Sequence, residues 1–412
     1  MTRSAPRTAA GRPRTTGGAL LAVSLLVVAA NLRPAVVGVA PLVAQIRVDL
    51  GLSAAGAGLL TTLPVLCFGL LAPVTPALSR RLGIEFLLLL ALVLLLGGIA
   101  LRLVPVVGVL LVGSVLVGSA VAVGNVSMPA LVKRDFPHRT GSMTGAYSMV
   151  LSAGGAVAAA ATVPIERALG SGWALALASW GALAVIAGVL WLPQVLRARR
   201  APTRGPAAVG AGVARQVWRD PLAWQVTLFM GLQSLHYYAM TAWTPSIFVD
   251  AGRSQAQAGL LLSLAGVVGL VASYCAPIVA TRVRRQSPLV VAVCGLYVVG
   301  YGGLLLAPDA GAVLWMVLLG LVQGSNIALA LLFIAQRAPD AAHAGELSGM
   351  AQGVGYCLAA AGPLGLGAVH DATGSWTVPL VIMLVLVVPT VVAAAGAGRD
   401  RLVGAPGAAT AG

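Results

Sequence analysis

The sequence predicts an all-α integral membrane protein whose twelve transmembrane helices form two six-helix halves. The chain has 412 residues, of which 59% are hydrophobic and 9% charged, and its mean hydropathy is +0.95. A soluble domain carries about 25% charged residues, so this composition indicates a chain that lies in a bilayer. The apolar runs and an internal repeat give the number and grouping of the helices.

Twelve apolar runs are each long enough to span the hydrocarbon core, which takes about 20 helical residues. They lie at about 18–46, 54–78, 84–104, 106–131, 141–165, 172–195, 221–247, 256–279, 287–306, 312–336, 346–368 and 375–397. Their connections are short except at 197–220, where Arg, Pro, Gly and Ala predominate and predict a linker. The expected organisation is a cytoplasmic tail (1–17), a six-helix bundle (18–196), a cytoplasmic linker (197–220), a second six-helix bundle (221–398) and a cytoplasmic tail (399–412).

The basic residues predict which side of the membrane each connection faces. With a cytoplasmic N-terminus, 21 Lys and Arg residues fall in cytoplasmic segments and four in outer loops, namely Arg47, Arg102, Arg167 and Arg253. Because positive residues accumulate on the cytoplasmic side, both termini are expected in the cytoplasm of a bacterial cell, with the spans in its inner (plasma) membrane. The same distribution explains the net charge of +15 without a nucleic-acid partner.

An internal repeat relates the two halves. The segment 51–60 recurs 201 positions later, Ala72-Pro73 recurs 204 positions later, and Gly145 of the fifth span matches Gly349 of the eleventh at the same offset of 204. Three matches in order at nearly one offset indicate a duplication. Two parallel six-helix repeats place a substrate site near the midplane, between the halves.

Arg33 is the only one of the 26 basic residues that falls in the middle of an apolar run. At about 1.5 Å per helical residue, its distance from the start of the run places the guanidinium roughly at the midplane. An arginine there costs at least ~2.5–3.5 kcal/mol and indicates a functional site by default. Its planar fork of donors suits a carboxylate, cyanate, nitrate or nitro group. The alternative is a structural arginine that pairs with carbonyl groups left open by Pro34.

Further candidate substrate contacts lie on the first, fourth, seventh, tenth and eleventh spans. They are Asn31, Asn125, Gln233, His236, Tyr237, Tyr238, Asn326, Gln352 and Tyr356. The stretch 233–238 contains the repeat position of Arg33, so His236 or Tyr237 is expected to face Arg33, and the alternative is helix packing by the tyrosines. The two residues of the eleventh span share one helix face, and the two buried asparagines of the fourth and tenth spans are expected mainly to bond helices together. Asn31 lies about 200° round the helix from Arg33, so it shares a ligand with Arg33 only if the helix breaks, and otherwise fixes the turn or bonds to a neighbouring helix.

The acidic residues all map near span ends or in loops. They are Asp49, Glu85, Asp135, Glu166, Asp220, Asp250, Asp309, Asp340, Glu346, Asp371 and Asp400. With no carboxylate expected at the midplane, an anionic ligand would neutralise Arg33 and a cationic one would be repelled. If protons are coupled, His236 is the expected intramembrane titrating group, and facilitated diffusion or anion exchange fits equally well.

The same residues argue against an enzyme and against a cofactor. Four scattered histidines and no clustered cysteines provide neither a catalytic set nor a metal site, and Cys67, Cys275, Cys294 and Cys357 are expected to be free packing thiols. Two matched halves favour alternating access over a channel, and a substrate-sensing receptor on the same scaffold stays an alternative.

Several motifs carry a resemblance to known transporters. They are Asn31-Leu32-Arg33-Pro34, the segments 128–137 and 347–352, Gly355-Tyr356, Gly362-Pro363 and Trp243-Thr244-Pro245. On the layout, the chain resembles the major facilitator superfamily from about residue 18 to 398, and on these motifs it resembles the cyanate/nitroimidazole transporter family. The loop at 76–85 fits the superfamily's signature at Arg81 and Gly83, but Arg80 stands at its acidic position, which argues against the charge-relay role usually given to that loop.

The resemblance implies the fold of that superfamily and secondary transport of a small anion or a small planar nitrogen compound. Cyanate-like, nitro and carboxylate compounds are the expected substrates. Arg33 is expected to bind them, and alternating access is expected to move them across the inner membrane. A monomer in the lipid bilayer is expected, and an efflux pump for a neutral or anionic drug-like compound is the alternative.

Overall fold

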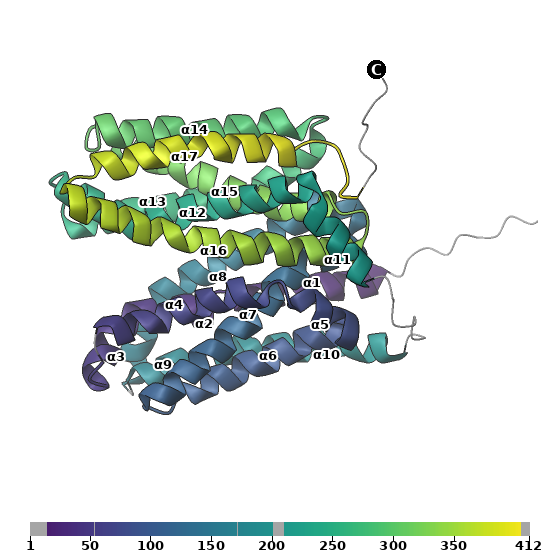
Figure 1. Ribbon diagram of the computed structural model, residues 1–412. Coiled ribbons are helices and arrows are strands. Elements are labelled where there is room, and N and C mark those ends of the chain that lie inside the picture. Colours follow the sequence, from purple (N-terminus) through teal and green to yellow (C-terminus); the bar gives the residue numbers. More distant parts are fainter. Residues whose placement is uncertain (1–14, 53, 171, 201–209, 405–412) are drawn as a thin grey trace, which may run out of the picture.

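The computed structural model describes residues 15–52, 54–170, 172–200 and 210–404, and every regular element in that part of the chain is a helix. The helices form two bundles that lie one against the other (Figure 1). Most of the two expected tails, residues 1–14 and 405–412, lies outside the described residues. The boundaries of the expected domains therefore stay predictions, whereas the all-helical fold is confirmed.

The two bundles follow the order of the chain. The first contains α1 (Thr15–Asn31), α2 (Pro34–Val37), η1 (Ala40–Leu42), α3 (Val43–Asp49), α4 (Ala54–Leu71), α5 (Thr75–Leu82), α6 (Ile84–Leu101), α7 (Val107–Asp135), η2 (Pro137–Arg139), α8 (Thr140–Leu169), α9 (Trp173–Ser179) and α10 (Gly181–Arg200). The second contains α12 (Pro221–Asp250), α13 (Gln255–Arg282), α14 (Gln286–Leu306), α15 (Ala312–Gln336), α16 (Ala341–Thr373) and α17 (Thr377–Ala397). Between them, the expected linker contains one helix, α11 (Gly210–Arg219), which packs on α16.

Among the described residues, nine helices are long and apolar enough to cross a membrane, or ten if the bent pair α4–α5 is one span. Helices α12 and α16 are 30 and 33 residues long, which is enough to span, but they are less apolar than those ten. They carry the polar stretches around residues 233–238 and 346–352, which lower their mean hydropathy. Counting both gives the twelve spans that the sequence predicts.

Three of the spans are divided rather than continuous: the first, the second and, at Trp180 between α9 and α10, the sixth. The first is divided at Leu32 and Arg33, between α1 and the four-residue helix α2, which begins at Pro34. The second bends by 64° between α4 and α5. Proline lacks the backbone N–H that would continue the helical ladder, so the break at Pro34 has a local cause.

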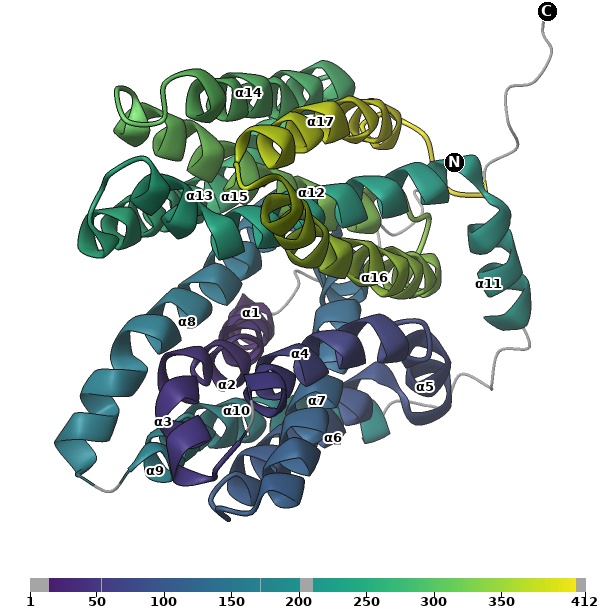
Figure 2. The ribbon, with the colours of Figure 1, turned by 60° about the vertical axis from the view of Figure 1, so that its left-hand side comes forward.

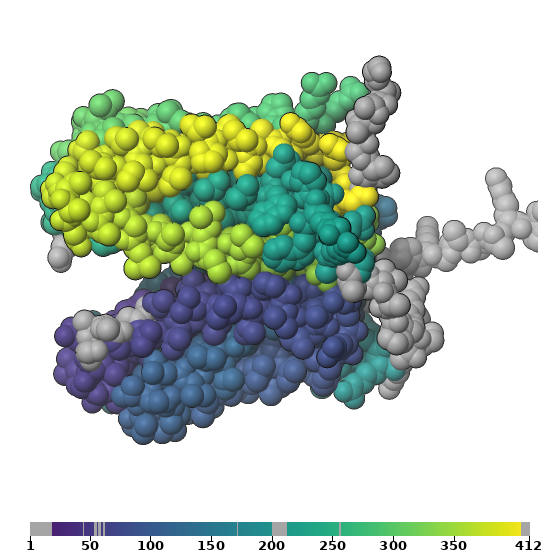
Figure 3. All heavy atoms as spheres, in the orientation of Figure 1, coloured from purple at the N-terminus to yellow at the C-terminus, as the bar shows by residue number. Residues whose placement is uncertain are grey.

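The two halves meet mainly near one end of the molecule. This end, where α5 and α11 lie, carries Arg80, Arg134 and Arg219, and we call it the basic end (Figure 1). Here α16 packs on α4 and α5, and α8 packs on α13 of the other half (Figure 2). The space-filling view shows the halves in contact toward the basic end and parted at the opposite end (Figure 3).

Glycines allow the helices of the two halves to touch at the basic end. A Cβ atom at Gly145 of α8 would lie 2.5 Å from the carbonyl oxygen of Tyr274, and one at Gly349 of α16 would lie 2.8 Å from the carbonyl oxygen of Ala72. Both distances are shorter than an ordinary contact, so no side chain fits at either position. Because Gly145 and Gly349 are the repeat-related pair of the sequence, the duplication is visible in the contact between the halves.

Candidate functional site

Arg33 lies at the break between α1 and α2, in the space between the halves. It precedes Pro34 with φ −119° and ψ −39°, and its carbonyl oxygen accepts a hydrogen bond of 2.9 Å from the Val37 backbone N–H. Upstream, the Leu32 N–H bonds to Ala29 at 3.1 Å in a tighter turn. The Arg33 side chain is half-buried, so it is neither sealed in the bundle nor open to bulk solvent.

Small residues of α8 leave room for this break. A Cβ atom at Gly154 would lie 2.7 Å from the Ala30 carbonyl oxygen, and one at Gly155 would lie 3.4 Å from the Cβ of Arg33. The backbone of α8 therefore runs directly behind Arg33. The guanidinium consequently extends away from α8, toward the second half.

Three tyrosines of the second half interact with the Arg33 guanidinium. Tyr237 and Tyr238 of α12 and Tyr356 of α16 lie within electrostatic range, and Tyr237 also supplies a hydrogen-bonding partner. The rings of Tyr237 and Tyr238 stand edge to face, 5.3 Å apart, and Tyr356 packs against Phe68 of α4 at 5.5 Å. The site thus combines a cation from one half with an aromatic, hydroxyl-bearing wall from the other.

Several buried hydroxyl groups have no hydrogen-bond partner among the described residues. On α7 and α8 they are the hydroxyls of Ser127, Thr144, Tyr147 and Ser148. Tyr147 of α8 is 2% exposed and lies near Tyr356, which places it beside the group around Arg33. Buried hydroxyls are usually bonded, so these groups are available to a bound molecule or to water.

Gln352 of α16 closes the site toward the basic end. Its Nε2 donates to the backbone carbonyl of Asn125 on α7, at 3.0 Å, and to the hydroxyl of Ser348 at 2.9 Å. Gln352 is 1% exposed, so this link between the halves is buried. The side chain of Asn125 is also buried, but Asn125 accepts this hydrogen bond through its backbone carbonyl and not through its side chain.

His236 lies outside the group around Arg33. It is completely buried inside the second half, with Nδ1 3.0 Å from the Tyr301 hydroxyl and Nε2 3.2 Å from the Thr390 hydroxyl. Its ring also stacks on Tyr297, with centroids 4.4 Å apart. Of the two neighbours expected to face Arg33, the structure therefore places Tyr237 there and turns His236 toward α14 and α17.

Three other candidates also bond within one half. Asn31 donates from Nδ2 to the carbonyls of Val27 (2.8 Å) and Leu183 (3.2 Å), which ties α1 to α10 even though the helix breaks beside it. Asn326 contacts Cys294 through its amide at 3.5 Å, and Gln233 bonds to the Ser234 hydroxyl at 2.7 Å. Among the described residues, none of these three side chains has a hydrogen bond to Arg33.

Arg102 is a buried cation that the charge count placed with the outer loops. It follows the span Ile84–Leu101 directly but is only 1% exposed. Its guanidinium donates to the carbonyl of Ala35 on α2 and to the Ser114 hydroxyl at 3.2 Å. A count of charges by loop cannot detect such a residue, because it records position along the chain and not burial.

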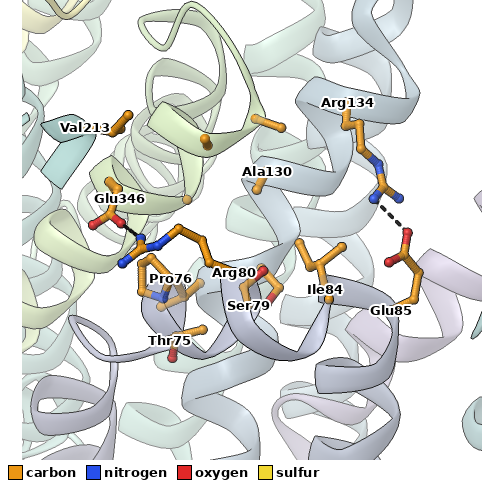
Figure 4. A pocket seen from close by; sticks show the side chains of 16 residues that line it. Thr75, Pro76, Ser79, Arg80, Ile84, Glu85, Ala130, Arg134, Val213 and Glu346 are labelled. Carbon is orange, nitrogen blue, oxygen red and sulfur yellow. Dashed lines mark hydrogen bonds and ion pairs between the residues drawn. The ribbon is translucent and has the colours of Figure 1, made fainter. Parts of the chain in front are cut away.

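A cavity of about 440 Å³ lies between the halves at the basic end (Figure 4). Val126 and Ser127, which directly follow Asn125, line it, as does Val213 of the linker helix α11. An ion pair between Arg80 of α5 and Glu346 of α16 joins the halves across it. On the first half, Arg134 pairs with Glu85 at 2.7 Å. The segment 76–85, in which Arg80 stands at the acidic position of the superfamily's signature, thus still forms an ion pair, with Glu346 of the other half.

Among the described residues, no group of three or more His, Cys, Asp or Glu side chains is placed to hold a metal ion. All four cysteines are free thiols, as expected.

Comparison with known proteins decides the family. The family model of the Major Facilitator Superfamily matches residues 20–363. The chain belongs to the major facilitator superfamily. Within this superfamily it is 40% identical to the 2-nitroimidazole transporter of Escherichia coli (strain K12) over 382 residues, which cover 93% of this chain and 96% of that protein.

It is also 30% identical to the cyanate transport protein CynX of the same organism, over 85% of this chain and 90% of CynX. The crystal structure of the E. coli fucose:proton symporter FucP superposes with a TM-score of 0.70 at 13% identity, covering 93% of this chain and 98% of that one. These findings confirm the predicted resemblance, the fold and a multi-pass membrane transporter rather than an enzyme.

Proposed function

We propose that this facilitator-superfamily protein moves a small planar anion or nitro compound across the membrane by alternating access, with Arg33 binding the substrate. The observation that carries the proposal is the environment of the guanidinium. It is half-buried between the halves, faces three tyrosines, and takes part in none of the ion pairs between described residues.

An unpaired cation in a region of low dielectric favours an anionic partner. A carboxylate, nitro or cyanate group would supply the missing negative charge or partial charge and accept the parallel N–H bonds of the fork. A cationic substrate would be repelled, because no carboxylate of the described ion pairs offsets Arg33.

The aromatic wall adds a preference for flat molecules. Tyr237, Tyr238 and Tyr356 offer ring faces and edges for stacking and hydroxyls for hydrogen bonds. Tyr147 adds a hydroxyl that has no hydrogen-bond partner among the described residues. The relatives named for 2-nitroimidazole and cyanate support a substrate of this size and shape.

The place where the halves touch supports alternating access. If the basic end is cytoplasmic, as the distribution of Lys and Arg predicts, the structure corresponds to a state closed toward the cytoplasm. Rocking of the halves about the site would then open the Gln352–Asn125 contact and the cavity behind it. Since both halves belong to one chain, a monomer suffices.

Uptake into liposomes containing the purified protein tests the proposal, with 2-nitroimidazole and potassium cyanate as probes. Arg33→Ala is expected to abolish saturable uptake, and Arg33→Lys to retain only part of it, because lysine keeps the charge but not the fork. Arg167→Ala is the control, since Arg167 is exposed at the end of α8. Saturable uptake by Arg33→Ala equal to that of the control would refute the proposal.

A further inference from the structure

Arg102 is buried against α2 and has no acidic partner in the part of the chain that the structure describes. Its guanidinium donates to the Ala35 carbonyl and to the Ser114 hydroxyl, while its Nε has no partner among the described residues. None of the ion pairs between described residues includes it. Burying a cation without a counter-ion is costly, so its retention calls for a role that an apolar side chain would not fill.

The packing of α6 on α7 is shaped to admit this side chain. A Cβ atom at Gly113 would lie 2.7 Å from the Gly98 carbonyl oxygen and 3.2 Å from the Cγ of Arg102. The two helices therefore touch through backbone, and the stem of Arg102 fills the adjoining space. From there the guanidinium reaches α2.

Helix α2 depends on such outside contacts. It has four residues, fewer than an isolated helix needs to be stable. On its other side Gly38 packs closely, since a Cβ atom there would lie 3.0 Å from the Thr162 hydroxyl and 3.2 Å from the Trp180 indole nitrogen. The bond from Arg102 to Ala35 holds α2 from the side of α6 and α7, two residues beyond Arg33.

We propose that Arg102 is a positioning residue, which fixes the broken segment α2 through the Ala35 carbonyl and thereby aims the Arg33 guanidinium at the substrate. The inference rests on the proposed function, because it concerns the geometry of the same site. Arg102 itself is sealed from the space between the halves and does not contact the substrate. Misplacement of a binding group by about 1 Å costs up to about 100-fold, so a loosened α2 weakens binding strongly.

The expected signature is a change in KM rather than in the amount of active protein. For 2-nitroimidazole uptake, Arg102→Met raises KM by about tenfold or more, while Vmax per reconstituted protein stays within about threefold. Arg102→Gln keeps an amide donor on a shorter side chain and recovers part of the affinity. Arg167→Met is the matched control and leaves KM unchanged.

A double-variant cycle links the effect to Arg33. In an Arg33→Lys background, Arg102→Met raises KM by much less than in the wild type, because the fork that it positions is already lost. If Arg102→Met fails to insert, Arg102→Gln and Ser114→Ala carry the test, with KM increases of about two- to fivefold expected for each.

Two results overturn the inference alone. One is an unchanged KM in Arg102→Met and Arg102→Gln beside an inactive Arg33→Ala. The other is an equal rise in KM for Arg102→Met in the wild-type and Arg33→Lys backgrounds, which would show that Arg102 does not act through the Arg33 guanidinium. Wild-type uptake by Arg33→Ala would instead overturn the proposed function, and the role of Arg102 with it.

Discussion

Replacing Gly145 by alanine is expected to open the basic end of the protein. The added Cβ would lie 2.5 Å from the Tyr274 carbonyl oxygen, whereas ordinary contacts begin at 3.4 Å, so α8 and α13 would have to separate locally. Overpacking of this kind costs about 1–3 kcal/mol. Because the strained contact exists only when the halves meet, the cost falls on the closed state and shifts the ratio of open to closed molecules by about 5- to 150-fold.

The shift can be measured through a buried residue of the basic-end cavity. Ala130 of α7 lines that cavity and is 5% exposed, so an Ala130→Cys reporter in a background without the four native cysteines reacts with a maleimide only when the halves part. When opening is faster than alkylation, the reaction rate follows the open population and rises by the same 5- to 150-fold.

The matched control is Gly295→Ala on α14, where a Cβ atom would meet nothing within 4 Å. It shares the change from glycine to alanine in a helix but leaves the contact between the halves intact. Equal alkylation rates for Gly145→Ala and Gly295→Ala would show that the glycine contact does not govern closure, and would refute the reasoning.

Three further predictions concern the ends and the core of the second half. Glu346→Gln removes the ion pair that joins the halves through Arg80. Since the Arg80 side chain is about one-third exposed, the closed state should lose only roughly 1 kcal/mol of stability. The cysteine reporter at position 130 should then be alkylated several-fold faster, and an unchanged rate would contradict the prediction. His236→Ala should lower the melting temperature, because it creates a cavity and removes the partner of the Tyr301 and Thr390 hydroxyls. The pH dependence of uptake should not change, since the ring is completely buried. A pH profile that shifts in this variant would contradict the buried position of the ring. At Asp340, burial would raise the pKa of the carboxyl, but hydrogen bonds from His343 outweigh this effect and hold the pKa below its usual range. The carboxylate therefore stabilises the fold above about pH 3.9, and this stabilisation is lost as the pH falls through the lower pKa of the folded state. Thermal melts should show Asp340→Ala less stable than wild type at pH 7, and an equal deficit at pH 3 would contradict the prediction.

The extent of each span could be predicted from the sequence because the bilayer permits little else. Backbone groups in hydrocarbon must bond within the segment, so apolar runs become helices of matching length. The expected run 287–306, for example, corresponds to α14 at Gln286–Leu306, and the run 312–336 to α15 at Ala312–Gln336. Arg33 could be singled out for the same reason, since a charge in such a run is conspicuous.

What the sequence could not supply is the direction in which neighbouring side chains point. His236 and Tyr237 are adjacent and differ by about 100° round the helix, which is enough to place one in the core of the second half and the other opposite Arg33. Hydropathy does not distinguish them, because both neighbouring surfaces are inside the protein. Arg102 was missed for a related reason: its burial depends on the close approach of α6 and α7 at Gly98 and Gly113, which hydropathy along the chain does not reveal.

The duplication is preserved where the halves touch and is lost where the substrate is proposed to bind. Gly145 and Gly349 occupy equivalent positions, and each meets the backbone of the opposite half, so closing the basic end uses the same contact twice. At the centre, by contrast, Arg33 has tyrosines as its counterparts. A rocking motion about a two-fold axis needs equivalent contacts on both sides, whereas one small anion needs only one cation. Changes at the glycines should therefore alter the balance between states, and changes at Arg33 should alter affinity for the substrate, so the two kinds of variant can be told apart by measuring alkylation and KM on the same protein.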